Sequence, residues 1–203
     1  MTDASSGVIR LRWGNTNAYF LHGLLIDTDL PGTLGAFFKE LKRSGLGIGD
    51  IRFVLATHYH PDHMGLIGEL TSLGVKHLLV ETQKDAVRFS DPIFARQNFV
   101  SYRPIRAEDA VVIRPEDSRA FLAGIGIRGE IVPTVSHSPD GIALITDGGD
   151  CFAGDLEPPA LRGGYESGSP LHRDWETIMR LRPARLWFGH LNDCILQSNG
   201  KDI

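Results

Sequence analysis

Three histidines and an aspartate fall within six residues of one another near the middle of the chain, at His58, His60, Asp62 and His63. In an extended chain, the side chains of residues two apart point to the same side, so His58 and His60 can bind one ion together. A proline then turns the chain, which lets Asp62 and His63 face a second ion close to the first. Neutral imidazole and carboxylate are ligands of zinc and also of iron or manganese. The segment therefore predicts a metal site with room for two ions.

The segments on either side of this cluster are of the kind that can hold it in place. Residues 51–56 form a short apolar run, which is typical of a strand buried on both faces. Residues 64–73 read as a helix that ends at Gly74. A histidine cluster in a surface loop, or one left from a purification tag, has no reason to lie between two such elements. We therefore interpret the cluster as a functional site.

The remaining sequence alternates between strand-like and helix-like patterns. Apolar runs and alternation predict strands at 8–13, 17–21, 23–26, 75–80, 110–113, 127–133 and 185–188, with a hairpin around 147–150. Helical spacing of apolar residues predicts helices at 34–41, 116–122 and 171–179. Residues 81–106 are expected to form helix plus loop, 136–141 a loop, and the proline- and glycine-rich stretch 158–170 a surface loop or lid.

Composition narrows the class of protein. The chain has 203 residues, 42% of them hydrophobic and 23% charged, with no linker, so we expect a single domain over 1–203. A net charge of −4 without a basic run argues against a nucleic-acid partner. Cys151 and Cys194 make no disulfide framework, and we see neither a signal peptide nor a membrane-spanning apolar run. We expect a cytoplasmic protein with a small-molecule substrate and no membrane partner; oligomeric state is not predicted.

The cluster resembles the signature of the metallo-β-lactamase superfamily, which reads His-x-His-x-Asp-His after a buried strand. The other residues that this family uses follow in the expected chain order. A later histidine matches at His137, an aspartate after a small residue at Asp155, and a histidine near the end at His190. The family's upstream "Asp-Thr-Gly" is matched by Asp27 and Thr28, with Asp29 where glycine is usual. The resemblance covers roughly residues 8–190.

The resemblance implies a fold and a ligand set. The fold would be an α/β four-layer αββα sandwich, in which two mixed β-sheets are flanked by helices. A first metal ion would be bound by His58, His60 and His137. A second would be bound by Asp62, His63 and His190, and Asp155 would bridge the two ions. Asp27 and Thr57 would orient these ligands.

The implied activity is that of a metal-dependent hydrolase. Two divalent ions, with zinc expected and iron or manganese as alternatives, would activate a bridging hydroxide that attacks an ester, thioester, lactone or related bond of a small molecule. Asp62, or a metal-bound water, would then pass a proton to the leaving group. Tyr59, which lies between two ligands, and Tyr165, in the lid-like stretch, are the side chains that we expect to contact the substrate.

Several alternatives remain at this stage. The best-known β-lactamases use a cysteine ligand, for which this chain offers aspartates. Glyoxalase II carries a helical domain after its last ligand, whereas thirteen residues follow His190 here. The RNA-processing nucleases of the family carry a large inserted domain. A persulfide dioxygenase would hold one iron through His58, His137 and Asp155 and consume dioxygen. A metal-binding scaffold without turnover is the third reading.

Overall fold

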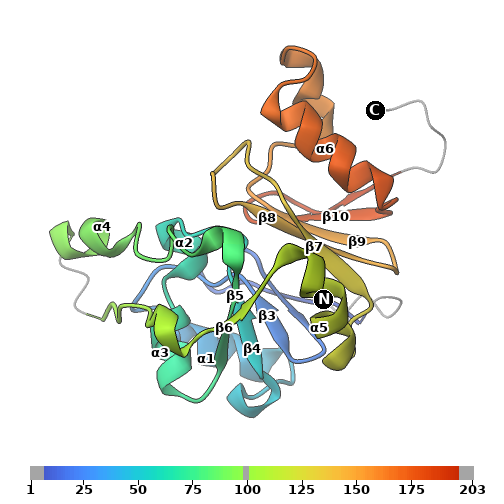
Figure 1. The fold of residues 1–203 in the computed structure, drawn as a ribbon. Helices are drawn as coiled ribbons and strands as arrows, with labels where there is room; N and C mark the ends of the chain where they lie inside the picture. The colour runs from blue at the N-terminus through green and yellow to red at the C-terminus, as the bar shows by residue number, and fades with distance from the viewer. Residues whose placement is uncertain (1–6, 98–100, 197–203) are drawn as a thin grey trace.

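The computed structural model describes residues 7–97 and 101–196, which form two β-sheets packed face to face with helices on the outer faces (Figure 1). The first sheet contains six strands in chain order, and it is antiparallel up to β3 and parallel from β3 to β6. Its strands are β1 (Ile9–Leu11), β2 (Ala18–Leu21), β3 (Leu24–Ile26), β4 (Phe53–Leu55), β5 (Lys76–Val80) and β6 (Val111–Ile113).

The second sheet has five strands in the order β11-β10-β9-β8-β7, and β9 and β10 are its parallel pair. Its strands are β7 (Gly129–Pro133), β8 (Ile142–Thr146), β9 (Asp150–Gly154), β10 (Arg185–Phe188) and β11 (Cys194–Ile195). The polar turn after residue 146 joins β8 to β9, as the hairpin signal predicted. The sheet pairs therefore agree with the mixed sheets that the sequence led us to expect.

The α-helices pack around the two sheets, and the helix Ser118–Gly124 packs against the layer between the sheets through Leu122. They are α1 (Leu34–Arg43), α2 (Pro61–Met64), α3 (Ile67–Ser72), α4 (Asp91–Arg96), α5 (Ser118–Gly124) and α6 (Pro170–Arg180). Short 3-10 turns occupy Ile48–Asp50, Glu81–Gln83, Ala107–Asp109, Pro115–Asp117 and Pro159–Gly164. Helices α1 and α3 lie on the first sheet, whereas α6 lies on the far side of the second sheet (Figure 1).

Three apolar layers hold this sandwich together. One lies between the first sheet and helices α1, α3 and α4, and another between the second sheet and α6. The middle layer lies between the sheets and contains an aromatic cluster of Tyr19, Phe152 and Trp187. The ring of Tyr19 lies 5.3 Å from that of Phe152 and 5.4 Å from that of Trp187, between ring centroids. Four layers separated by three apolar interfaces are the αββα arrangement, so the expected fold class is confirmed.

Local departures from the expected elements have identifiable causes. The helix expected over 64–73 is divided into α2 and α3 at Gly65, where a Cβ atom would lie 2.4 Å from the carbonyl oxygen of Asp29. The stretch 158–170, expected to be irregular, contains a 3-10 turn at Pro159–Gly164. Strand β11 was not expected, because its two exposed residues carry no apolar alternation.

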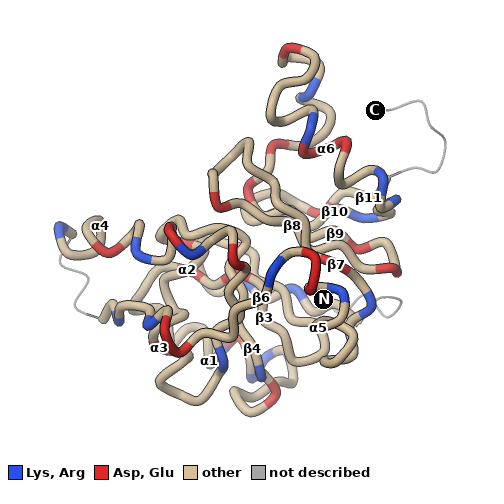
Figure 2. The backbone as a smooth tube through the Cα atoms, in the orientation of Figure 1, with Lys and Arg blue, Asp and Glu red and all other residues tan. Residues whose placement is uncertain are grey.

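Charge is spread over the surface. Figure 2 shows lysines and arginines interspersed with acidic residues along the tube. Arg119, for example, pairs with Glu130 at 2.8 Å and with Asp147 at 2.9 Å. In the described part of the chain, no helix is both long enough and apolar enough to cross a membrane.

The aromatic cluster between the sheets predicts where a truncation is most costly. Replacing the fully buried Phe152 by alanine removes a ring from the middle layer and leaves a cavity. We expect the free energy of unfolding of the metal-free protein to fall by about 3–5 kcal/mol in denaturant titrations. Phe38→Ala is the control, because 39% of Phe38 is exposed. Equal losses in the two variants would contradict this description of the core.

Candidate metal centre

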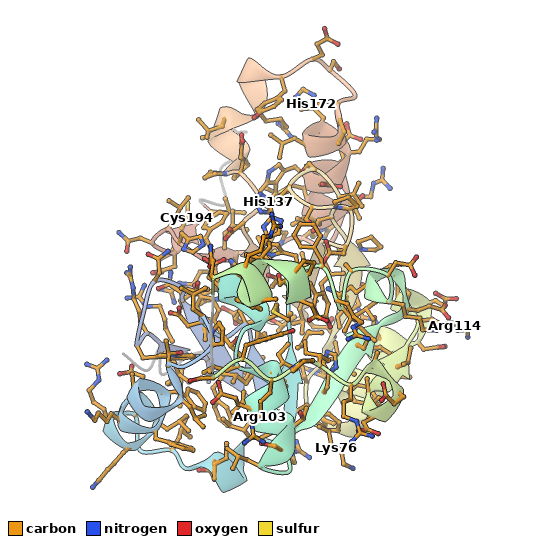
Figure 3. The ribbon with its side chains drawn as sticks, turned by 90° about the vertical axis from the view of Figure 1, so that its left-hand side faces the viewer. Lys76, Arg103, Arg114, His137, His172 and Cys194 are labelled. Carbon is orange, nitrogen blue, oxygen red and sulfur yellow. The ribbon has the colours of Figure 1, made fainter. Side chains whose placement is uncertain are left out.

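The candidate site lies at one edge of the sandwich, in the loops that follow the carboxyl ends of several strands. The cluster at 58–63 follows β4, His137 lies between β7 and β8, Asp155 follows β9, and His190 follows β10. Figure 3 shows His137 near the middle of the molecule, among the side chains where the two halves meet, with His172 farther out, in the first turn of α6. Within residues 7–97 and 101–196, the groups of side chains close enough to share a metal ion all lie at this edge.

One triad consists of His58, His60 and His137. Their potential ligand atoms all lie within 4.8 Å of one another. Nε2 of His137 is 3.3 Å from Nδ1 of His60, and the ring centroids of His58 and His137 are 4.8 Å apart. The structure therefore brings together the three side chains that the resemblance assigned to a first ion.

A second triad consists of Asp62, His63 and His190, and its potential ligand atoms also lie within 4.8 Å of one another. Nε2 of His190 is 3.1 Å from Oδ2 of Asp62 and 3.4 Å from Nε2 of His63. These are the side chains that the resemblance assigned to a second ion.

Asp155 lies between the two triads. Its Oδ1 is 3.3 Å from Nε2 of His63, and its Oδ2 is 3.3 Å from Nε2 of His190 and 3.8 Å from Nε2 of His137. The neighbouring Gly189 permits this approach, since a Cβ atom there would lie 2.4 Å from Oδ1 of Asp155. One carboxylate thus faces ligands of both triads.

The donor atoms fit divalent ions. Two nitrogen atoms that bind the same zinc ion in tetrahedral geometry lie about 3.3 Å apart. The separations of 3.3 Å between His60 and His137 and of 3.4 Å between His63 and His190 match this spacing. Nε2 of His58 and Oδ1 of Asp155 are both buried without a hydrogen-bond partner, and Nε2 of His63 lies 3.3 Å from that Asp155 oxygen. Buried acceptor atoms without a partner are energetically costly, and a bound ion would satisfy both of them.

Hydrogen bonds fix which nitrogen of the His58, His63 and His190 rings faces the site. Thr57 donates its hydroxyl proton to Asp27, so its oxygen accepts from Nδ1 of His58 at 3.2 Å and leaves Nε2 as the free lone pair. Nδ1 of His63 donates to Asp27 at 2.9 Å, and Nδ1 of His190 donates to the Asn15 carbonyl oxygen at 3.3 Å. Such bonds from the far nitrogen are typical of metal-binding histidines.

Burial and charge set the protonation states of the metal-free site. Burial, reinforced by His63, lowers the pKa of His58 to about 2, so its ring is neutral. Burial also acts to lower the pKa of His63, but Asp27 and Asp155 outweigh it and raise that pKa to about 10. For Asp155, burial acts to raise the pKa, yet His63 lowers it to about 2. An ion that binds Nε2 of His63 therefore displaces a proton from a stabilised imidazolium.

Asp27 orients both the strand end and one of the ligands. Its Oδ1 accepts from the Thr57 backbone N–H at 2.6 Å, and its Oδ2 accepts from the Thr57 hydroxyl at 2.8 Å as well as from His63. Asp27 is 1% exposed and has a positive φ of 61°, a conformation rare outside glycine, asparagine and aspartate. These contacts agree with the orienting role expected for Asp27 and Thr57.

Sequence reasoning missed a supporting loop at residues 14–17. Oδ2 of the buried Asp29 accepts from the Thr16 backbone N–H at 3.3 Å, and the Thr16 hydroxyl donates to Oδ2 of Asp62 at 3.4 Å. The Asn15 carbonyl of the same loop contacts His190. The available signal was Asp29 itself, which stands where the resembled family usually has glycine.

A second missed group ties the histidine segment to the loop of His137. The buried Gln83 donates its amide N–H groups to the carbonyl oxygens of Ala56 and Asp140, both at 3.1 Å. The Asp140 carboxylate accepts from the Tyr59 backbone N–H at 2.7 Å. A glutamine after a strand has no distinctive spacing, so nothing in the sequence pointed to Gln83.

The expectation that Tyr59 contacts substrate is corrected by its position. Its side chain is 1% exposed and lies in the layer between the first sheet and its helices. Its hydroxyl is hydrogen-bonded to Nε2 of the buried His77 at 2.7 Å. Because alternate residues of the extended segment point to opposite sides, the side chain between His58 and His60 faces the core and not the metal site.

Tyr165 lies on the open side of the site. It is 45% exposed, and its hydroxyl donates to Oε2 of Glu157 at 2.6 Å. Together with Ser136, His137 and Leu171, these two residues line a pocket of about 190 Å³. Tyr165 therefore lies where a substrate contact is geometrically open, and that contact stays a prediction.

Comparison with known proteins gives the same family at the level of sequence. A sequence model described as the metallo-beta-lactamase superfamily matches residues 11–190. The Beta-lactamase-like protein 2 homolog of Drosophila melanogaster is 26% identical over 207 residues, which cover 95% of this chain and 66% of the fly protein. The uncharacterized protein YobT of Bacillus subtilis (strain 168) is 24% identical over 187 residues, 87% of this chain and 78% of that protein. The chain thus spans about two thirds of the fly protein's length.

Solved structures share the fold. The metallo-beta-lactamase family protein TTHA1429 of Thermus thermophilus matches with a TM-score of 0.67 at 23% identity, over 93% of this chain and 74% of that one. TTHA1623 in a di-iron-bound form matches with a TM-score of 0.66 at 22% identity, over 96% of this chain and 97% of that one. At such identities the likeness establishes the fold alone, and the iron is a property of TTHA1623.

The contacts of Asp27 predict its effect on metal binding. Asp27→Asn replaces one accepting oxygen by an NH2 donor. At the Oδ2 position this removes the acceptor of both His63 Nδ1 and the Thr57 hydroxyl, and at the Oδ1 position it removes the acceptor of the Thr57 backbone N–H. We expect the affinity for the more weakly bound zinc ion to fall by about 10–100-fold, measured by titration against a chromophoric chelator. Asp109→Asn, at a largely exposed carboxylate, is the control. An unchanged zinc affinity would show that Asp27 does not orient the ligands.

His77 predicts a dependence of stability on pH. Burial lowers its pKa from 6.5 to about 4, so the unfolded chain takes up a proton in this window and the folded chain does not. The stability that the neutral ring contributes is complete above pH 6.5 and is lost as pH falls to 4, by roughly 3 kcal/mol in all. In metal-free protein, the advantage in unfolding free energy of the wild type over His77→Gln should therefore decrease as the pH is lowered from 6.5 to 4. A difference that does not vary with pH would contradict the assignment.

Proposed function

Because this chain belongs to the metallo-beta-lactamase superfamily, we propose that it is a binuclear metal-dependent hydrolase that cleaves an ester, thioester or lactone bond of a small molecule. The observation that carries the proposal is the placement of Asp155 between two complete ligand triads. A centre with seven converging ligand side chains is more than a single structural ion needs. We propose zinc as the metal, since five imidazoles and two carboxylates suit it.

The residues divide into two sets of ligands that share a carboxylate. His58, His60 and His137 would hold one ion, Asp62, His63 and His190 the other, and Asp155 would contact both. The ions would supply Lewis-acid polarisation of the scissile carbonyl and a water molecule of lowered pKa. The chain's own contribution is to turn Nε2 of His58, His63 and His190 toward the ions, through Thr57, Asp27 and the Asn15 carbonyl.

Asp62 is the acidic side chain that we propose to move a proton to the leaving group. Its carboxylate is 26% exposed, so it is open to the solvent side of the site, unlike the buried ring of His63. The Thr16 hydroxyl and His190 hold its Oδ2 in place, at 3.4 and 3.1 Å. Tyr165, beside the pocket that includes His137, is the proposed substrate contact.

An iron-dependent oxygenase is the competing activity. It would use His58, His137 and Asp155 as the ligands of one iron ion, and the second triad would bind no ion. Asp62, His63 and His190 converge within the same 4.8 Å as the first triad, so a second ion has a place to bind, whereas an oxygenase of this fold would retain these residues without using that ion. Oxygen uptake and iron content separate the two activities.

The test combines metal content with turnover. Protein purified without a metal-binding tag should contain about two zinc ions per chain and should hydrolyse a member of a panel of lactones, thioesters and phosphodiesters. Asp155→Ala should lower the metal content toward one ion and lower kcat/KM by at least about 100-fold, because it removes the shared ligand. Asp147→Ala, at an exposed carboxylate on the β8–β9 hairpin, is the matched control.

Two outcomes would overturn the proposal. Full activity of Asp155→Ala with two ions retained would show that Asp155 is not the shared ligand. Iron as the bound metal, with dioxygen consumed and no member of the panel hydrolysed, would assign the oxygenase activity instead.

A further inference from the structure

We propose that the open side of the metal centre binds an apolar, uncharged arm of the substrate, about six heavy atoms long, beside the bond that is cleaved. This inference rests on the proposed function and narrows its substrate class. It is carried by the distribution of exposed hydrophobic side chains, by a pocket next to His137 and by the charges around that pocket.

Several exposed hydrophobic side chains contact a ligand, line the pocket beside His137 or lie on segments next to the ligands in sequence. Among residues 7–97 and 101–196, nine large hydrophobic residues are exposed, and five of them adjoin the site in sequence or in space. These five are Phe89, Val135, Leu161, Tyr165 and Leu191, each 45–55% exposed. The others are Phe38, Leu73, Val112 and Ile195, which lie on or next to four different elements away from the ligands.

Contacts and chain connections tie the five residues to the centre. The Phe89 ring lies 5.8 Å from the ring of His60, between centroids. Val135 precedes His137 by two residues, and Leu191 follows His190 directly. Leu161 and Tyr165 belong to the segment that follows Asp155. Of the five, Phe89 contacts a ligand and Tyr165 lines the pocket that includes His137, so these two residues place exposed apolar surface at the centre itself.

The pocket beside His137 has the size and the lining for such an arm. It has a volume of about 190 Å³, and Tyr165, Pro170 and Leu171 form apolar parts of its wall. At roughly 30 Å³ for a water-sized group, this volume holds about six heavy atoms. Ser136 is on the same wall, and its hydroxyl oxygen is buried without a hydrogen-bond partner.

Charge selects against an anionic arm. No lysine or arginine is among the residues that line this pocket, whereas Glu157 is. The groups that most strongly affect the pKa values of His58, His60 and Asp155 are histidines and aspartates. A carboxylate or phosphate at the far end of the arm would lie near Glu157 without a side-chain cation beside it, whereas the proposed ions, whose charge Asp62 and Asp155 partly offset, would lie at the other end of the arm. An uncharged arm meets no such penalty.

The probes are alkyl hydroxamates, whose head group chelates metal ions while the chain extends into the site. Binding of acetohydroxamate through octanohydroxamate to the zinc-loaded protein is measured by calorimetry. We expect the affinity to rise about two- to fourfold per methylene up to about six carbons and then to level off, the upper value corresponding to full burial at about 0.8 kcal/mol per methylene. Adipic acid monohydroxamate, which has the same chain length as hexanohydroxamate but ends in a carboxylate, should bind at least about tenfold more weakly.

Two alanine substitutions test whether the arm contacts Phe89 and Tyr165. Phe89→Ala and Tyr165→Ala should lower the affinity for hexanohydroxamate by about three- to tenfold and leave that for acetohydroxamate unchanged, because the metal ligands are intact. Phe38→Ala is the matched control, since Phe38 is an exposed aromatic residue on α1. Unchanged zinc content and circular dichroism establish that each variant is folded and loaded.

The inference is overturned if affinity does not depend on chain length, if the carboxylate probe binds as tightly, if Phe38→Ala has the same effect, or if no hydroxamate binds the loaded protein. Calorimetry needs no turnover, so the two proposals fail separately. Chain-length dependence without hydrolysis of any ester would remove only the proposed reaction. Hydrolysis without chain-length dependence would remove only the apolar arm.

Discussion

The carboxylate of Asp27 makes the hydrogen bonds on which the rest of the site depends. It is buried at the end of β3 and accepts from both the backbone and the hydroxyl of Thr57 at the end of β4, and also from His63. A buried carboxylate needs such donors, because an unpaired one is costly to take out of water. The same three bonds connect two neighbouring strands, fix the ring of His63 and leave the Thr57 oxygen free to accept from His58. The Asp27 carboxylate therefore orients one ligand of each triad, His63 directly and His58 through Thr57.

The two sheets are joined differently at the site edge and in the middle. Between the sheets the contacts are apolar, whereas at the site edge they are hydrogen bonds that cross from one sheet to the other. The Ile142 backbone N–H donates to the Thr57 carbonyl at 2.9 Å, and the Asn17 N–H donates to the Gly189 carbonyl at 2.7 Å. The Tyr19 hydroxyl donates to the Phe188 carbonyl at 2.7 Å. These bonds keep the ligands from β4 in register with those from the second sheet.

Sequence patterns predicted the strands and the ligands that follow them, because both depend on the order of residues along the chain. The ligands follow strands whose apolar runs are plain in the sequence, and their order along the chain matches the family, so their convergence could be expected. The direction in which a single side chain beside a ligand points was harder to predict. Tyr59 faces the core because of the extended backbone around it, and the reading that it contacts substrate neglected this alternation. The parts played by Thr16, Asp29 and Gln83 depend on loops brought together by the whole fold, which no local pattern records.

The central claim is that the seven side chains form one centre for two ions. Anomalous diffraction from crystals of the protein grown with zinc, recorded on both sides of the zinc absorption edge, tests it most directly. The account predicts two peaks, one bound by His58, His60 and His137, the other by Asp62, His63 and His190, with Asp155 in contact with both. A single peak at full occupancy, or peaks bound by other residues, would contradict it.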